Sequence, residues 1–191
     1  MTAPRPRALL LAALLPVACR STEAAPVEHA PVVLDAAQRS ALERFVGSWQ
    51  HAGGADEQQA ALDAVSEVTT QMGSLIGGMA QSRLEPVVLI DATLSIDELD
   101  GIVTIRRSEH PGPFTAPADG KVFDMQTTDG DDARGSLRLD GPTLVTRVET
   151  DDGGGERTYR IDALGKLVVV GRTFSPRLPA EVITTATYTR P

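Results

Sequence analysis

The sequence predicts a mainly β domain with an α-helical insertion: an antiparallel up-and-down β-barrel or half barrel whose mouth is capped by helices near the N-terminus. Two observations predict this fold class. After residue 87, short runs with an apolar residue at every second position are separated by turn signals such as Asp100-Gly101 and Asp140-Gly141-Pro142, which is typical of an antiparallel meander. Before residue 87, apolar residues recur three or four positions apart, as on one face of a helix.

A short helix and a longer helical region precede these strands. Asp35 is a typical N-cap for a helix that begins at Ala36, and a first strand is expected over residues 46–50. Residues 55–84 carry an apolar stripe that predicts two helices or one kinked helix, because three glycines interrupt it. Pro86 is expected to end the region. The stripe consists of Leu62, Val65, Val68, Met72, Leu75, Ile76 and Met79, and it suits either core packing or a lid.

Eight further strands are predicted after the helices. They cover residues 88–96, 102–107, 121–127, 135–139, 143–150, 157–162, 166–174 and 182–189. Pro111-Gly112-Pro113 is expected to form a loop, and Gly153-Gly154-Gly155 to lie between two strands. Closing such a sheet removes exposed edges. One folded domain is therefore expected over residues 35–191, with the helical insertion at about 55–84.

Residues 1–18 have the layout of a secretory signal peptide. Two arginines give a basic start, residues 8–15 are apolar, and the small Ala18 precedes Cys19. The apolar run is shorter than the roughly 20 residues that span a bilayer. We therefore expect a targeting segment that is removed on export.

The segment Leu15-Pro16-Val17-Ala18-Cys19 resembles a bacterial lipobox, although Pro16 stands where that motif has leucine. The resemblance implies that Cys19 is the lipidation site. Residues 19–34, rich in Ala and Pro, would then form a flexible tether. The protein would be lipid-anchored in the bacterial cell envelope and face the periplasm. The alternative is an ordinary secreted protein that is cut at another alanine.

The composition is acidic. The 191-residue chain has a formal net charge of −8, and removing residues 1–18 leaves −10, because that segment holds two arginines and no acidic residue. Nucleic acid is a poor partner for such a surface, since phosphate binding needs clustered Lys and Arg. Cys19 is the single cysteine, so no internal disulfide is expected.

The order of elements resembles the calycin group, which comprises lipocalins and fatty-acid-binding proteins. The residues that carry this resemblance are Gly47-Ser48-Trp49 in the first strand and Tyr188-Thr189-Arg190 at the end of the last. The helical pair directly after the first strand is similar to the fatty-acid-binding branch, where it forms a lid. Residues 45–54 and 175–179 also resemble a group of uncharacterised bacterial proteins. The resemblance implies a small hydrophobic or amphipathic ligand inside the barrel.

The candidate ligand-binding residues are those expected to face a cavity. They are Trp49, Met72, Met79, Phe123, Met125, Arg172 and Tyr188. Resemblance to fatty-acid-binding proteins implies an Arg-x-Tyr pair on the last strand that reads a ligand carboxylate. Tyr188 matches the tyrosine, but Ala186 takes the arginine's place. Arg172 is the candidate to supply the charge instead, unless it points outward into solvent.

No residue pattern points to catalysis, to a metal or to a cofactor. His29, His51 and His110 lack partners at metal-ligand spacing and are expected to lie exposed in the tether and in loops. No serine or cysteine pairs with a positioned base. The acidic turn at residues 129–132 does not fit a helix-loop-helix calcium site. We therefore expect no enzyme, no metal and no cofactor.

Two functions remain open. The first is an envelope lipoprotein that binds a small hydrophobic or amphipathic, lipid-like ligand in its barrel. The second is a structural or adaptor lipoprotein with a filled barrel and a protein partner. Periodicity cannot choose between them, because alternating apolar residues serve a packed interior and a cavity equally.

Overall fold

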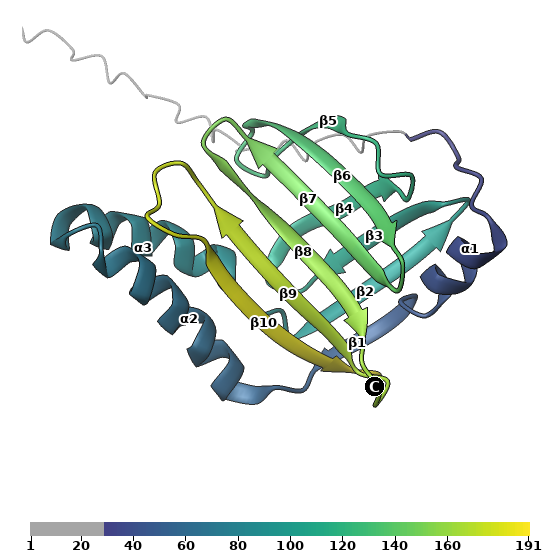
Figure 1. Ribbon diagram of the computed structural model, residues 1–191, viewed down its shortest axis with the longest axis horizontal. Coiled ribbons are helices and arrows are strands. Elements are labelled where there is room, and N and C mark those ends of the chain that lie inside the picture. Colours follow the sequence, from purple (N-terminus) through teal and green to yellow (C-terminus); the bar gives the residue numbers. More distant parts are fainter. Residues whose placement is uncertain (1–28) are drawn as a thin grey trace, which may run out of the picture.

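The computed structural model describes residues 29–191, which form three helices and ten strands (Figure 1). In chain order these are α1 (Ala36–Glu43), β1 (Gly47–His51), α2 (Gly54–Thr70), α3 (Ser74–Val88), β2 (Thr93–Leu99), β3 (Ile102–Arg107), β4 (His110–Pro117), β5 (Phe123–Gln126), β6 (Asp132–Asp140), β7 (Thr143–Thr150), β8 (Gly153–Ile161), β9 (Leu167–Phe174) and β10 (Val182–Thr189). The predicted signal peptide and Cys19 lie outside the described residues.

The strands form one antiparallel sheet in the order β4-β3-β2-β1-β10-β9-β8-β7-β6-β5. The first and last strands pair, with His51 opposite Tyr188, so the sheet curls into a half barrel whose edges are β4 and β5. The link between these edges returns to β6, where the backbone N–H of Gly120 donates to the carbonyl of Leu137 at 2.9 Å. The predicted fold class, an up-and-down half barrel with a helical insertion, is confirmed.

The end of the half barrel beside α1 is filled with side chains. Asp35 caps α1 as predicted, and the side chain of Gln38 completes a reciprocal capping box. Leu42 and Phe45, each 1% exposed, and Trp49, 2% exposed, then pack into the main core. Burying one such side chain contributes about 1.5–3 kcal/mol. The interior beside α1 is therefore packed with side chains.

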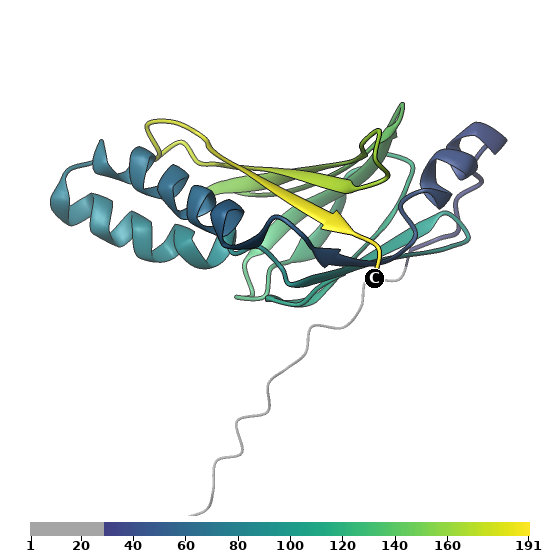
Figure 2. The ribbon, with the colours of Figure 1, turned by 90° about the horizontal axis from the view of Figure 1, so that it is seen from below.

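The helical pair α2 and α3 lies at the opposite end of the half barrel (Figures 1 and 2). Val65 and Val68 of α2 pack against Val182 of β10 and against Val88 at the end of α3. The α2 half of the predicted apolar stripe is therefore core. Of the helices within residues 29–191, none has the length and apolar character to cross a membrane.

The chain reverses between α2 and α3 at Gly73, whose φ of 78° disfavours any residue with a side chain. Gly77 lets α3 approach α2 closely, because a Cβ there would collide with the carbonyl oxygen of Thr69. After this reversal, Leu75 and Met79 on α3 remain 78% and 58% exposed. The α3 half of the stripe therefore faces outward.

Two helix and strand boundaries differ from the prediction. Pro86 lies inside α3, which continues to Val88, and β2 begins only at Thr93. Pro86 lacks the N–H that would bond to the carbonyl of Ser82, and only two residues of α3 follow it. Burial of Val88, 5% exposed, favours continuing the helix for two more residues. The predicted strand start at residue 88 was therefore too early, because the alternating apolar residues include the last residue of α3 and a short link before β2.

Two predicted breaks are also strands. Pro111-Gly112-Pro113, expected as a loop, lies within the bounds of β4 but has no register partner on β3. The pairing shifts at this point, between Ile105 and Arg107, and such a bulge in an edge strand tolerates prolines. Gly153-Gly154-Gly155 opens β8 rather than separating strands. A Cβ at Gly154 would lie 2.5 Å from the carbonyl oxygen of Val148 and 2.9 Å from the ring of Phe174. Glycine here serves close packing within the sheet.

Candidate functional site

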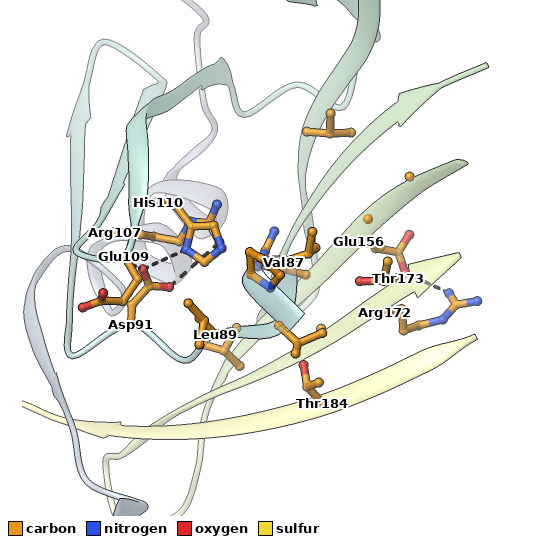
Figure 3. Close-up of a pocket in the computed structure, with 18 of the residues that line it drawn as sticks. Val87, Leu89, Asp91, Arg107, Glu109, His110, Glu156, Arg172, Thr173 and Thr184 are labelled. Atoms are coloured by element: carbon orange, nitrogen blue, oxygen red, sulfur yellow. Dashed lines mark hydrogen bonds and ion pairs between the residues drawn. The ribbon is translucent and has the colours of Figure 1, made fainter. Parts of the chain in front are cut away.

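A pocket of about 750 Å³ opens between the C-terminal end of α3 and the inner face of the sheet. Residues 86–91 border it on the α3 side, β2, β3 and β4 contribute one wall, and β7 to β10 contribute the other (Figure 3). Its volume lies within the range of about 300–1,000 Å³ that is usual for small-molecule sites. The half barrel is therefore filled at one end and hollow at the other.

The floor of the pocket is formed by residues that also belong to the main core. Five residues that are at most 9% exposed belong to both: Leu94, Tyr159, Val169, Ala186 and Tyr188. On the α3 side, Val87 and Leu89, 41% and 40% exposed, extend the apolar lining. An apolar chain placed here would contact carbon on two sides, and each Å² of apolar area removed from water contributes about 25 cal/mol.

A polar cluster around Asp91 forms one side of the pocket (Figure 3). The Asp91 carboxylate accepts the backbone N–H of Glu109 at 2.9 Å and lies 3.1 Å from Nδ1 of His110. Nη1 of Arg107 lies 3.9 Å from its second oxygen, which is too far for a hydrogen bond. Burial acts to raise the pKa of Asp91, but these hydrogen bonds and the Arg107 charge outweigh it and hold the pKa below its usual value.

Two nitrogen atoms in this cluster are buried without a hydrogen-bond partner among the described residues. They are Nη1 of Arg107 and Nε2 of His110. Arg107 and His110 are direct register partners on β3 and β4, so their side chains lie on one face with Cβ atoms about 5 Å apart. Buried polar atoms are nearly always hydrogen-bonded. The pair is thus suited to a polar ligand group.

A second guanidinium comes from the opposite wall. Arg157 on β8 lines the pocket and is half-buried, and it forms no ion pair within residues 29–191. Burial, and then the charge of Arg157, lower the pKa of Arg107 to about 10. Burial, followed by the Asp91 charge, raises the pKa of Tyr188, which keeps its hydroxyl protonated. Within this inner cluster, two guanidinium groups face one buried carboxylate, which suits an anion, while Asp129, Asp131 and Asp152 border the same pocket farther out.

Of the seven predicted ligand-binding residues, Tyr188 and Arg172 border this pocket. Tyr188 lies on its floor. Arg172 contributes backbone, but its guanidinium is held by Glu181 and Glu156, at 2.8 Å and 3.1 Å, on the outer face of the sheet. Its register partner Ile183 is likewise turned outward and is 55% exposed. This corrects the expectation that Arg172 charges the cavity, because strand alternation turns its side chain outward.

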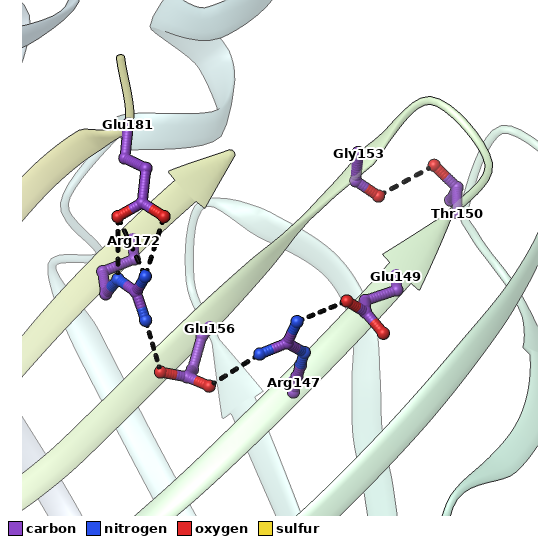
Figure 4. Close-up of polar contacts among 7 residues, drawn as sticks. All are labelled: Arg147, Glu149, Thr150, Gly153, Glu156, Arg172 and Glu181. Atoms are coloured by element: carbon purple, nitrogen blue, oxygen red, sulfur yellow. Dashed lines mark hydrogen bonds and ion pairs between the residues drawn. The ribbon is translucent and has the colours of Figure 1, made fainter. Parts of the chain in front are cut away.

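The outer face carries a ladder of charged residues on the neighbouring strands β7, β8 and β9, extended by Glu181 just before β10 (Figure 4). From Glu181 the contacts run through Arg172 to Glu156, then to Arg147 at 3.3 Å, and finally to Glu149. Exposed ion pairs of this kind contribute little individually, with a median of about 0–1 kcal/mol. Arg172 is therefore part of the outer surface of the sheet and not of the binding site.

The other five predicted residues lie outside the pocket. Trp49 belongs to the filled end, Met72 lies half-buried at the α2–α3 turn, and Met79 is exposed on α3. Phe123 and Met125 lie over Gly135 of β6, where a Cβ would be 2.6 Å and 2.8 Å from their side chains. The pocket occupies only one end of the half barrel, so these five side chains do not line it.

The histidines are also not the exposed loop residues that the sequence suggested. His110 lies in β4 and borders the pocket. His51 is half-buried in β1, with Nε2 at 3.0 Å from Glu57, and Nε2 of His29 lies 3.0 Å from the carbonyl oxygen of Thr115. These partners are distant in the chain or in another element, so local spacing did not reveal them. Within the described chain, no group of three or more His, Cys, Asp or Glu side chains is placed to hold a metal.

The functional residues that sequence reasoning missed are Asp91, Arg107, His110, Arg157 and Tyr159. Two signals were present. Arg107 continues the inward alternation of Val103 and Ile105. Arg157-Thr158-Tyr159 is an Arg-x-Tyr sequence whose arginine and tyrosine share the inner face of β8, although such a pair was expected on the last strand.

No protein-family model and no curated protein sequence matches this chain. Solved structures do match its fold. A secretory abundant heat soluble protein from Ramazzottius varieornatus has a TM-score of 0.51 at 11% identity, and lipid binding protein 8 from Caenorhabditis elegans has 0.50 at 13%. Both matches cover 78% of this chain and 96% of the other chain. The fluorescent protein UnaG matches with a TM-score of 0.48 at 21% identity, over 78% of this chain and 99% of its own.

These likenesses concern the fold, since the identities are low and one fold hosts many functions. The helical pair between β1 and β2 is the feature that the sequence resemblance implied. The chain therefore has a calycin-like fold of the fatty-acid-binding-protein type.

Proposed function

We propose that this protein binds a small amphipathic, lipid-like molecule with an acidic head in the hollow end of its half barrel. The observation that carries the proposal is one pocket of about 750 Å³ that joins an apolar floor to a wall holding Arg107. The apolar floor suits a hydrocarbon tail. The two guanidinium groups, of Arg107 and Arg157, suit an anionic head.

The fold likeness supports this proposal by analogy alone. One matching structure is named as a lipid binding protein. In this chain the pocket lies between the end of α3 and the inner face of the sheet. The rival function, an adaptor with a barrel filled throughout, is less well supported, because only the α1 end is filled.

The proposed setting of this activity is the bacterial envelope, and its basis is the sequence alone. A lipid attached to Cys19 would hold the domain at a membrane, with residues 19–34 as the tether. Binding without chemistry is proposed, because the polar groups of the pocket suit recognition of a ligand. Replacing Cys19 by Ala should release the protein from the membrane fraction. A wild-type protein that is already free of membranes would contradict the anchor.

The binding proposal is tested by native mass spectrometry of the purified protein and by titration with a fluorescent fatty acid. The critical variant is Thr184→Trp, because Thr184 is half-buried on the pocket side of β10. An indole there would occupy the cavity and should weaken binding at least about tenfold. The matched control is Ile183→Trp on the outer face, 55% exposed, which should bind like the wild type. Absence of both a bound lipid and uptake of the probe would overturn the proposal.

A further inference from the structure

The buried pair Arg107 and His110 offers two different hydrogen-bonding functions to a ligand. They face each other across β3 and β4 in direct register. Each has a buried nitrogen without a partner among the described residues, Nη1 and Nε2 respectively. Both residues line the pocket. Both nitrogens are closed to solvent, so a ligand group that pairs with them has to displace the atoms that cover them. What each nitrogen requires from that group depends on its protons.

Arg107 requires an acceptor, because a guanidinium has only N–H donors. His110 is fixed by its second nitrogen. Nδ1 lies 3.1 Å from an oxygen of Asp91, and the same carboxylate already accepts the backbone N–H of Glu109. An ionised carboxylate only accepts hydrogen bonds, so Nδ1 must carry the hydrogen. In the neutral imidazole, Nε2 is then a lone pair that requires a donor.

We infer that the pocket selects acidic amphipaths whose head carries a hydrogen-bond donor next to the carboxylate, such as a 2-hydroxy acid or an N-acyl amino acid, with Arg107 binding the carboxylate and His110 accepting from the donor. This inference rests on the proposed function and narrows its ligand class. A plain fatty acid satisfies Arg107 but presents only acceptors to Nε2. A hydroxyl or amide N–H beside the carboxylate satisfies both.

The charges around this pair suit such a head. Asp91 faces both residues, Arg107 at 3.9 Å and His110 at 3.1 Å, and so offsets one cation. Arg157 faces the cluster from β8 and adds a second guanidinium, while Asp129 and Asp131 border the same pocket from the β5–β6 turn. Glu109 is exposed at the rim and contributes its backbone N–H. The apolar residues Val87 and Leu89 lie beside the cluster (Figure 3). The hydrocarbon tail of a ligand whose head binds the cluster would contact them.

The test compares three probes by isothermal titration calorimetry at about pH 8, because Nε2 accepts a hydrogen bond only in the neutral imidazole. The probes are dodecanoate, 2-hydroxydodecanoate and N-dodecanoylglycine. The two donor-bearing probes should bind at least about tenfold more tightly than dodecanoate, because a site built for a hydrogen bond rejects the analogue that lacks it. The variant His110→Phe should remove this ratio and keep dodecanoate binding. The control Glu43→Gln, at an exposed position on α1 away from the pocket, should keep the ratio.

The possible failures are distinguishable. If all three probes bind with equal affinity to the wild type, or if His110→Phe keeps the ratio, the inference is overturned and the proposed function stands. If none of the probes binds, the proposed function itself is overturned. Circular dichroism of His110→Phe establishes that the variant is folded before its ratio is interpreted. Arg107→Met provides a second variant, which should weaken all three probes about equally.

Discussion

The guanidinium of Arg190 lies over the indole of Trp49, with 4.4 Å from Cζ to the ring centroid. Its Nη1 and Nη2 donate to the carbonyls of Val46 and Arg44, each at 3.1 Å. The indole N–H of Trp49 donates in turn to the carbonyl of Phe45 at 2.9 Å. The last residues of the chain thus close the filled end of the half barrel over its first strand.

Replacing Arg190 by Ala should lower the free energy of unfolding by about 1–3 kcal/mol. The variant loses a cation–π contact, about 0.5–2 kcal/mol, and two hydrogen bonds to carbonyls. Chemical denaturation measures the change. The exposed Arg160 on β8 provides the control, since Arg160→Ala should stay within about 0.5 kcal/mol of the wild type. Equal effects of the two variants would show that the contact with Trp49 contributes no stability.

Gly47 should not tolerate a side chain. Its φ is 129°, and a Cβ there would lie 2.6 Å from Nη1 of Arg190. We expect Gly47→Ala to cost about 1–3 kcal/mol, measured by thermal or urea unfolding. The opposite result is expected for Gly78→Ala on α3, where no atom lies within 4 Å of the new Cβ; helix propensity should stabilise that variant by up to about 1 kcal/mol. A neutral Gly47→Ala would contradict the strain.

Stability should fall in acid partly through Asp91. The pKa of its carboxyl is lower in the folded protein than its usual value of about 3.9. Its contribution is therefore present above about pH 4 and is lost as the pH falls through the lower, folded value. Asp91→Asn should thus be less stable than the wild type near pH 7, and the difference should shrink toward pH 2. Urea unfolding across this range measures it. A constant difference at all pH values would contradict the assignment.

Arg157 and Arg172 should behave oppositely in ligand binding. Arg157 lines the pocket, whereas Arg172 is bound by Glu156 and Glu181 on the outer face. Arg157→Met should weaken dodecanoate binding about tenfold or more, because it removes one of two cations. Arg172→Met should leave affinity within about twofold and cost at most about 1 kcal/mol of stability. Calorimetric titration of both variants decides, and a larger loss for Arg172→Met would place the ligand elsewhere.

The strand pattern was readable because a half-buried sheet imposes a period of two. β7 and β10 occupy the predicted residues 143–150 and 182–189. The prediction failed where glycine and proline serve packing instead of turns. Gly154 lies in a crowded strand and Pro113 in an edge strand, and neither environment is visible in local sequence.

The sequence by itself determined the fold class, the helical insertion and the order in which a helix capped by Asp35 precedes the strand that contains Trp49. These features follow from local periodicity and capping. Only the tertiary structure decided where the interior is filled and where it is hollow. Inward-facing apolar residues alternate along the strands in the same way at the filled end and at the hollow end of the half barrel. Whether an end is filled depends on which element packs against the sheet there, α1 at one end and α3 at the other. The site is likewise tertiary: Asp91, Arg107 and Arg157 meet only when β3 and β8 face each other across the curled sheet.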